Sequence, residues 1–198
     1  MECPYCGGEL SEFLPQCPHC GIDLTRLDAV MGAVPRLSPD ITDSAQILTA
    51  PVRRRLLASI HRFHRSFPQI RLSMVTVSET PNVSLRTYAF WIFNRSAFGS
   101  GFSKGPKNRH ILLALHSGSN EAALMVGYGL EPFVGRRHLD AILQEQIPHF
   151  SRGAWGEGLE GTVQLLEQTL VEIWSAIDQT YGVSIRQIYH EDAHGEEL

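Results

Sequence analysis

All four cysteines of this 198-residue chain lie within its first 20 residues, as the pairs Cys3/Cys6 and Cys17/Cys20. Two residues between the cysteines of a pair allow both thiolates to reach one ion while the backbone turns beneath it. Proline follows the first cysteine of each pair and glycine follows the second, which pre-sets the turn and leaves the backbone permissive after it. The spacing predicts a small zinc ribbon at residues 1–21. Its Zn²⁺ would be structural, because protein fills all four ligand positions.

Four cysteines in this pattern have two alternative chemistries, iron binding and thiol redox catalysis. Iron is an alternative metal, since four thiolates also suit it. Thioredoxin-like redox chemistry is disfavoured, because its CxxC motif lies near a βαβ pattern that this region lacks. A ribbon of this size has almost no core, so metal binding supplies its folding free energy. No Lys or Arg occurs between Met1 and Gly21, which favours a protein partner over nucleic acid.

Two histidine patterns resemble metal sites but fit them poorly. His190 to His194 spells HExxH, the spacing of zinc proteases, yet it lies in an acidic C-terminal tail, residues 183–198, without a downstream third ligand. His61 and His64 are three residues apart on a predicted helix that also carries the run Arg53-Arg54-Arg55. We expect both of these histidines to be exposed on the helix surface rather than to bind a metal.

Composition limits the classes of function. The formal net charge is −4, with 43% hydrophobic and 19% charged residues, which is typical of a soluble globular protein without general affinity for nucleic acid. No apolar run approaches the ~18 residues that a membrane span needs, and the first residues do not resemble a signal peptide. The sequence therefore predicts a cytoplasmic protein that does not insert into membranes.

The rest of the chain alternates between helical and strand patterns. Residues 22–50 contain scattered Pro and Asp and are predicted to be a linker with one short helical turn. The main domain is predicted at residues 51–182, with Pro148 ending or kinking one of its helices. Its predicted helices cover 51–67, 84–98, 136–147 and 158–180, and its predicted strands cover 70–78, 111–115 and 122–126. Such an alternation favours an α/β sandwich.

Three segments carry a resemblance to a known family: VGYGLE at 126–131, IPHF at 147–150, and Gly153-Ala-Trp155 followed by Gly158 and Gly161. From about residue 50 to 181 the chain resembles the TPM domain, named after a thylakoid lumen protein, a photosystem repair protein and a modulator of acetylcholine receptors. The resemblance implies an α/β/α fold with a small mixed sheet. It also implies acid phosphatase activity or Ca²⁺ binding, through carboxylates at the loop end of the sheet.

The carboxylates implied by the resemblance are largely replaced in this chain. Asn108 stands where the family has an Asp, and Arg136 and Arg137 lie near another usual Asp. Glu131 is the one clear carboxylate that remains. Loss of oxygen ligands and gain of cations both weaken binding of Ca²⁺ or Mg²⁺. We therefore expect little binding of either ion.

The same end of the domain gains positive charge. Five basic residues lie in or beside its loops: Lys104, Lys107, Arg109, Arg136 and Arg137. They form either an anion or acidic-partner site or a solvated surface, and the solvated surface is the commoner case. Taken together, the sequence predicts a non-catalytic binding or adaptor protein. The alternative is a phosphatase-like hydrolase that retains family activity through Glu131 and neighbouring polar groups.

Overall fold

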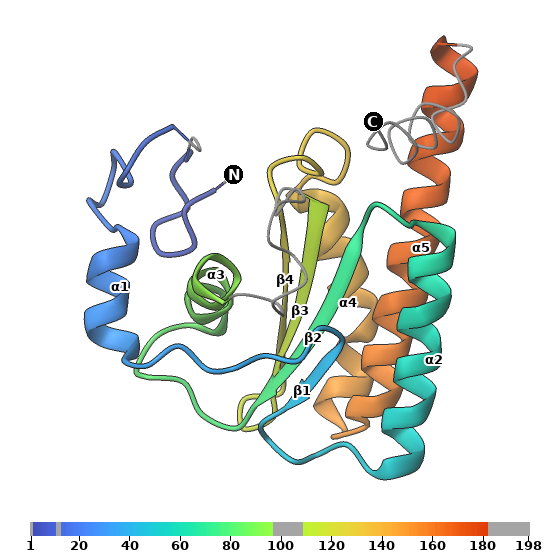
Figure 1. Ribbon diagram of the computed structural model, residues 1–198, viewed down its shortest axis with the longest axis horizontal. Coiled ribbons are helices and arrows are strands. Elements are labelled where there is room, and N and C mark those ends of the chain that lie inside the picture. Colours follow the sequence, from blue (N-terminus) through green and yellow to red (C-terminus); the bar gives the residue numbers. More distant parts are fainter. Residues whose placement is uncertain (1, 11–12, 97–108, 182–198) are drawn as a thin grey trace, which may run out of the picture.

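A mixed sheet of four strands forms the middle layer of the protein in the computed structural model, which describes residues 2–10, 13–96 and 109–181. The strands lie side by side in chain order, from one edge of the sheet to the other (Figure 1). Strand β2 pairs parallel with both β1 and β3, whereas β3 and β4 form an antiparallel hairpin. The strands are β1 (Ile41–Asp43), β2 (Arg71–Val77), β3 (His110–His116) and β4 (Glu121–Val126).

The middle strands are apolar on both faces because helices cover both sides of the sheet. Every residue of β3 from His110 to Leu115 is buried, and β2 is buried from Leu72 to Val77. Such continuous apolar runs are typical of strands that are packed from both faces. The short predicted strand at 111–115 is therefore confirmed, and a tight turn at 117–120 joins it to β4.

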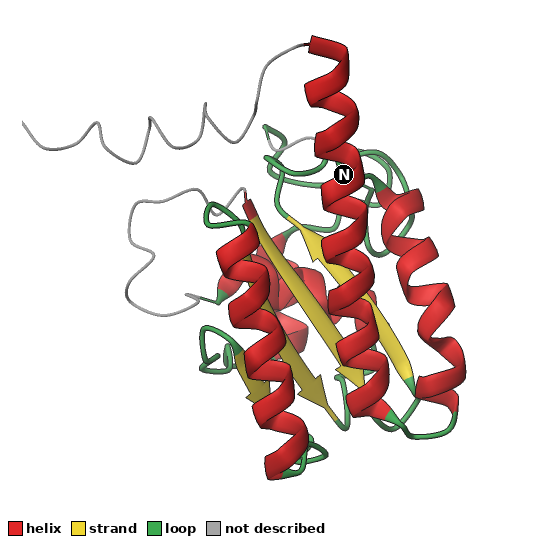
Figure 2. Ribbon diagram, turned by 90° about the vertical axis from the view of Figure 1, so that its right-hand side faces the viewer, coloured by secondary structure: helices red, strands yellow, loops and turns green. Residues whose placement is uncertain are grey.

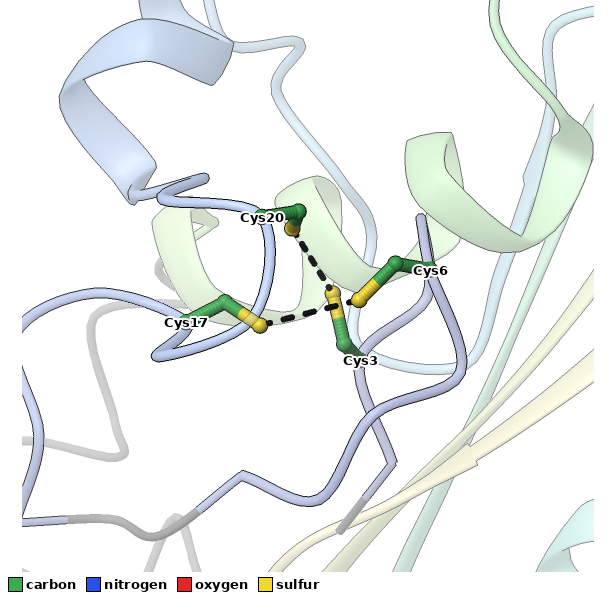
Figure 3. A group of neighbouring side chains, drawn as sticks. All are labelled: Cys3, Cys6, Cys17 and Cys20. Atoms are coloured by element: carbon green, nitrogen blue, oxygen red, sulfur yellow. Dashed lines mark hydrogen bonds between the residues drawn. The ribbon is translucent and has the colours of Figure 1, made fainter.

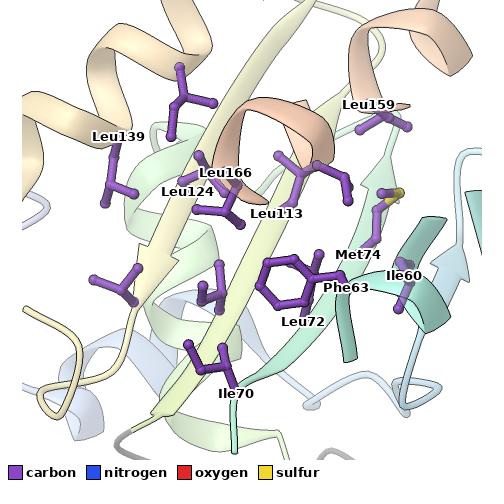
Figure 4. Packing of buried hydrophobic residues seen from close by; sticks show 14 of the residues in the cluster. Ile60, Phe63, Ile70, Leu72, Met74, Leu113, Leu124, Leu139, Leu159 and Leu166 are labelled. Atoms are coloured by element: carbon purple, nitrogen blue, oxygen red, sulfur yellow. The ribbon is translucent and has the colours of Figure 1, made fainter. Parts of the chain in front are cut away.

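Three helices cover one face of the sheet: α2 (Ala50–Ser66), α4 (Arg136–Ser151) and α5 (Trp155–Tyr181). Figure 2 shows them side by side in front of the sheet. Their apolar stripes meet alternate residues of the strands, and Phe63, Leu113 and Leu166 lie at the centre of this packing (Figure 4). Each of these three side chains is fully buried. This face holds the larger of the two apolar clusters.

Helix α3 (Leu85–Arg95) packs on the opposite face, and α1 (Leu24–Met31) packs against α3 (Figure 1). Ser84 caps α3, because its hydroxyl accepts a hydrogen bond from the Thr87 N–H at 3.2 Å. Trp91 is buried beneath α1, and its indole N–H donates to the Asp28 carboxylate at 2.8 Å. Helices therefore cover both faces, which confirms the α/β/α sandwich with a mixed sheet.

Residues 22–50 contain more regular structure than the single helical turn expected of them. Helix α1 has eight residues, and β1 joins the edge of the sheet beside β2. The Asp43 carboxylate then accepts hydrogen bonds from the N–H groups of Ile47 and Leu48, at 3.2 and 3.0 Å. These elements are not predictable from the sequence, because both are short and contain too few apolar residues to show a period.

Two features of the last helices differ from the prediction. Helix α4 continues through Pro148 to Ser151, because a proline so near the end removes only one hydrogen bond of the last turns. Helix α5 begins at Trp155 and so includes Gly156 and Gly158, which lie against side chains of α2 and α4. Within the described part of the chain, no helix combines the length and apolar character that crossing a bilayer requires.

Candidate metal centre and adjoining groove

The four-cysteine module, residues 2–22, consists of two similar turns. In the first, the Gly7 N–H donates to the Cys3 carbonyl at 2.9 Å, and in the second the Gly21 N–H donates to the Cys17 carbonyl at 2.9 Å. Both glycines have positive φ, +76° and +69°, a conformation that other residues adopt only with strain. The expected role of the two glycines is confirmed. These matching turns bring the cysteine pairs face to face.

The four sulfur atoms converge on one point (Figure 3). All lie within 4.8 Å of one another, and the Sγ atoms of Cys3 and Cys20, like those of Cys6 and Cys17, are 3.7 Å apart. These separations are too long for a disulfide bond. A tetrahedral ion with metal–sulfur bonds of about 2.3 Å requires neighbouring sulfurs about 3.8 Å apart. The donor set and its geometry therefore fit a tetrahedral, thiolate-bound metal ion such as zinc.

The thiols cannot all ionise without a cation among them. Burial opposes ionisation of Cys17, but hydrogen bonds from the backbone of Cys20 and His19 bring its pKa down to about 6. A backbone hydrogen bond from Ile22 favours the Cys20 thiolate, yet burial and the neighbouring thiols raise its pKa to about 12. A bound divalent cation removes this conflict, because it stabilises every thiolate at once.

The four-cysteine module rests on the sandwich. The Thr87 hydroxyl donates a buried hydrogen bond to the Pro4 carbonyl at 3.2 Å. Glu2 forms ion pairs with Arg86, at 4.0 Å, and with Arg136. One turn of α3 and the first turn of α4 thus contact the same end of the module. His19 is exposed and covers Gly8, where an added Cβ would lie 2.3 Å from the imidazole ring.

A groove lies between the module and the sandwich, along strand β4, with a volume of about 760 Å³. We call it the β4 groove. Residues of the module, β4 and the starts of α3 and α4 line it, among them Glu2, Gly7, Glu9, Ser84, Arg86, Glu121, Ala122, Leu124, Val126, Glu131, Arg136 and Asp140. It joins Glu131 and Arg136, two of the residues that the sequence singled out. Glu2, Glu9 and Arg86 were missed, because nothing local in the sequence places the module here.

Of the other predicted site residues, Arg109 and Arg137 are described, and neither is among the residues that line the groove. Arg109 is half-buried just before β3, Arg137 is exposed on α4, and Asn108 lies outside the described residues. The HExxH segment at 190–194 and the lysines at 104 and 107 lie outside them as well. Arg136 is exposed, and its guanidinium pairs with Glu2 and also with Asp140, at 3.1 Å.

The two histidines of α2 have separate partners. His61 lies 3.3 Å from the Asp40 carboxylate and is exposed, as expected. His64 is half-buried, and its Nε2 accepts a hydrogen bond from the Leu72 N–H at 3.0 Å. Burial and the positive charge of Arg71 lower the pKa of His64, so the neutral ring is favoured. These contacts join α2 to the residue before β1 and to the start of β2, and the expectation that His64 is exposed is wrong because its ring packs against β2. Neither histidine belongs to a metal-ligating cluster among the described residues.

Residues 41–169 match the TPM domain family, which is more than half of the chain. The fold just described agrees with that match, and the protein belongs to the TPM domain family. The match begins at β1 and ends within α5. The four-cysteine module lies outside the matched residues. No curated protein matches the chain.

Several solved structures share the fold. The N-terminal domain of a P. gingivalis protein is 21% identical, with a TM-score of 0.52 over 76% of this chain and 88% of that chain. The N-terminal domain of the cg2496 protein from Corynebacterium glutamicum is 16% identical, with a TM-score of 0.52 over 71% and 86%. The BA42 protein from Bizionia argentinensis is 12% identical, with a TM-score of 0.55 over 66% and 86%. These identities establish a common fold and nothing more.

Proposed function

We propose that this protein is a non-catalytic binding or adaptor protein, in which a structural Zn²⁺ holds the four-cysteine module on a TPM domain. One observation carries the proposal. Among the described residues, the four cysteines are the one place where three or more metal-ligating side chains gather, and Glu131 shares its groove with Arg136. A hard cation needs several oxygen ligands around one point, and among the described residues no such gathering includes Glu131.

Zinc is the metal that the module suits best. Four thiolates in a tetrahedral arrangement are typical of structural zinc, and no ligand position is left open for water or substrate. Iron remains the chemical alternative, because the same four ligands also bind it. Elemental analysis of the purified protein separates the two metals. One zinc per chain is expected, and one iron per chain would replace zinc in this proposal.

The partner we propose is another protein. The module carries no Lys or Arg between Met1 and Gly21, so it offers no cation to a phosphate backbone. It does expose apolar side chains, since Tyr5, Phe13 and Leu14 are 68%, 86% and 49% accessible. Aromatic side chains exposed on a rigid support are typical of protein contact surfaces.

A calorimetric titration of Ca²⁺ and Mg²⁺ into the zinc-loaded full chain at neutral pH tests the proposal. We expect no binding heat up to millimolar concentrations of either ion. Hydrolysis of p-nitrophenyl phosphate is measured on the same sample, and we expect none above the buffer. Micromolar binding of either ion, or turnover, would contradict the non-catalytic assignment.

The alternative is a phosphatase-like hydrolase. It is favoured by the family match together with the position of Glu131 in a groove large enough for a small substrate. Glu131→Ala separates the two functions. In a hydrolase this substitution removes turnover without lowering the free energy of unfolding, because Glu131 is only partly buried. Glu79→Ala is the matched control, since Glu79 is exposed and lies outside the groove.

A further inference from the structure

Strand β4 is an edge strand, and its outer edge forms part of the β4 groove. The Gly127 N–H donates to the His110 carbonyl at 2.9 Å. This bond identifies which residues of β4 direct their peptide groups toward β3 and which direct them outward. In an antiparallel pair every second residue turns its N–H and C=O groups away from the partner strand. These residues in β4 are Ala122, Leu124 and Val126.

No other part of the described chain satisfies that edge. Within residues 2–10, 13–96 and 109–181, no hydrogen bond reaches the outward peptide groups of Ala122, Leu124 and Val126. Their side chains are held by the sandwich, and Leu124 and Val126 are only 7% and 5% exposed. The outward peptide groups of β4 therefore lie on the side of the strand that lines the groove. An extended peptide satisfies such groups by adding a strand to the sheet.

The charged side chains around this edge determine whether a basic or an acidic peptide is favoured. Two arginines line the groove, Arg86 and Arg136, and both are paired with Glu2. Carboxylates outnumber them and lie at both ends of β4, on the module and at the start of α4: Glu2, Glu9, Glu121, Glu131 and Asp140. Counted over the described residues alone, the lining thus carries three more negative than positive charges. Opposite charge steers association and favours a basic partner.

From this edge and these charges we infer that the β4 groove binds an extended, basic segment of a partner protein as an added strand. The inference rests on the proposed binding function and names its site and ligand class. A second copy of the chain is disfavoured, because edge-to-edge pairing would place two acidic grooves together. The chain's own residues 183–198 are disfavoured for the same reason, since they hold four acidic residues and one arginine.

Binding of a defined probe tests the inference. The probe is a fluorescein-labelled, end-capped peptide of four Lys-Val repeats, titrated into the zinc-loaded full chain at low salt and followed by fluorescence anisotropy. We expect saturable binding that weakens with salt, and weaker binding by about tenfold or more for the Glu-Val peptide. A peptide of the same sequence with its internal amides N-methylated keeps every side chain but donates no strand hydrogen bonds. We expect it to lose binding by about tenfold or more as well.

Paired variants locate the peptide. Glu9→Lys combined with Glu121→Lys reverses two exposed charges in the groove and should weaken the Lys-Val peptide by about tenfold or more. The control combines Glu79→Lys with Glu172→Lys, two exposed residues outside the groove, which gives the same change in net charge. The control should bind within about twofold of the unmodified protein if the site is local.

Each contrary result overturns the inference. Absence of binding at millimolar peptide, equal binding of the N-methylated peptide, or equal weakening in both double variants would each do so. A stable dimer in sedimentation that excludes the peptide would assign the edge to a second copy instead. Turnover of p-nitrophenyl phosphate that disappears in Glu131→Ala contradicts the proposed adaptor function whatever the peptide does. If the peptide does not bind and no hydrolysis is detected, only the inference about the β4 groove is contradicted.

Discussion

The four-cysteine module and the sandwich are held together by different means. In the module, the cysteines Cys3 and Cys17 are almost fully buried, while the aromatic residues Tyr5 and Phe13 are exposed. In the sandwich, two apolar clusters fill both sides of the sheet, and the central strand β3 is buried almost throughout. The module depends on a metal ion and the sandwich on burial of apolar surface.

This difference predicts how each region fails. A site of four ligands is lost when one ligand is lost, because no other contact replaces it. A core distributes its stability over many side chains, so one substitution lowers the free energy of unfolding by a limited amount. Among the described residues, the polar contacts that join the regions are Thr87 to Pro4, and Glu2 to Arg86 and Arg136, and Ile22 packs on the smaller apolar cluster. Damage to the module should therefore leave the sandwich folded.

The largest effect is expected from Cys17→Ser. Bound metal should fall from one ion per chain to none, because the other three thiolates no longer close a tetrahedron. Elemental analysis measures the loss, and hydrogen exchange should show the amides of the module unprotected. Tyr5→Ala is the matched control in the same region and should keep its metal. Loss of the cooperative melt of the sandwich in Cys17→Ser would contradict the separation of the two regions.

Leu113→Ala attacks the sandwich in turn. Leu113 is fully buried at the centre of the larger cluster, so the cavity should lower the free energy of unfolding by about 2–5 kcal/mol. Chemical denaturation measures this loss, and the metal content of the folded protein should stay unchanged. The control is Val171→Ala, because Val171 is 43% exposed on α5. Equal effects of the two substitutions would mean that the core is not where the stability lies.

Gly158→Ala tests the close contact of α4 with α5. A Cβ at this position would lie 2.4 Å from the ring of Phe150, which is buried and cannot move freely. We expect a loss of about 1–3 kcal/mol in the free energy of unfolding, measured by denaturation. Gly135→Ala provides the comparison, since nothing lies within 4 Å of its added Cβ. A stabilised Gly158→Ala variant would show that the two helices are less tightly packed than described.

Acid should weaken the two regions for different reasons. Protons displace metal from thiolates in the module, whereas in the sandwich they favour unfolding through buried His110. Burial lowers the pKa of His110 to about 4, and its Nε2 lies 3.0 Å from the Ser73 hydroxyl. The unfolded chain binds this proton near its ordinary pKa of about 6.5. As pH falls from there toward 4, His110 should therefore lower the free energy of unfolding by about 1.4 kcal/mol per pH unit.

The pH effect is measured as a difference between two proteins. Denaturation of the unmodified protein and of His110→Gln is compared at pH 7, 6 and 5, which removes the contribution of the carboxylates common to both. The unmodified protein should have the steeper dependence. NMR titration of the His110 ring gives its pKa directly, and an unshifted value would remove the predicted slope.

The sequence predicted those parts of the fold whose signals are long or strongly spaced. The helix at 51–67 and the strand at 70–78 were recognisable because their apolar residues keep one period over a whole element. The strands at 111–115 and 122–126 were recognisable because each is a short continuous apolar run. The four cysteines were recognisable because two CxxC pairs are rare without a metal. Residues 22–50 were read as a linker, since an eight-residue helix and a three-residue strand carry too few apolar positions to show a period.

The groove could not be predicted, because it depends on contacts between residues distant in the chain. Glu2 meets Arg136 across 134 positions, and Thr87 meets Pro4 across 83. The sequence predicts Arg136 as one of five basic residues at the loop end of the domain, whereas its pairing with Glu2 follows from where the module packs. The glycines near the start of α5 also made the predicted helix begin too late, at residue 158 instead of Trp155, for a similar reason. They are required by neighbours on other helices, and composition alone does not reveal that requirement.

The path of the first 43 residues has a mechanical consequence. The module lies beside β4 at one edge of the sheet, α1 crosses the outside of α3, and β1 joins the opposite edge (Figure 1). A tensile load applied at the N-terminus would therefore reach the metal–thiolate bonds first, then α1, and the sheet only after both. Unfolding under force would therefore begin in the N-terminal segment, with the module opening and α1 separating from α3. The hydrogen bonds between β2 and β3 would stay unloaded during these steps.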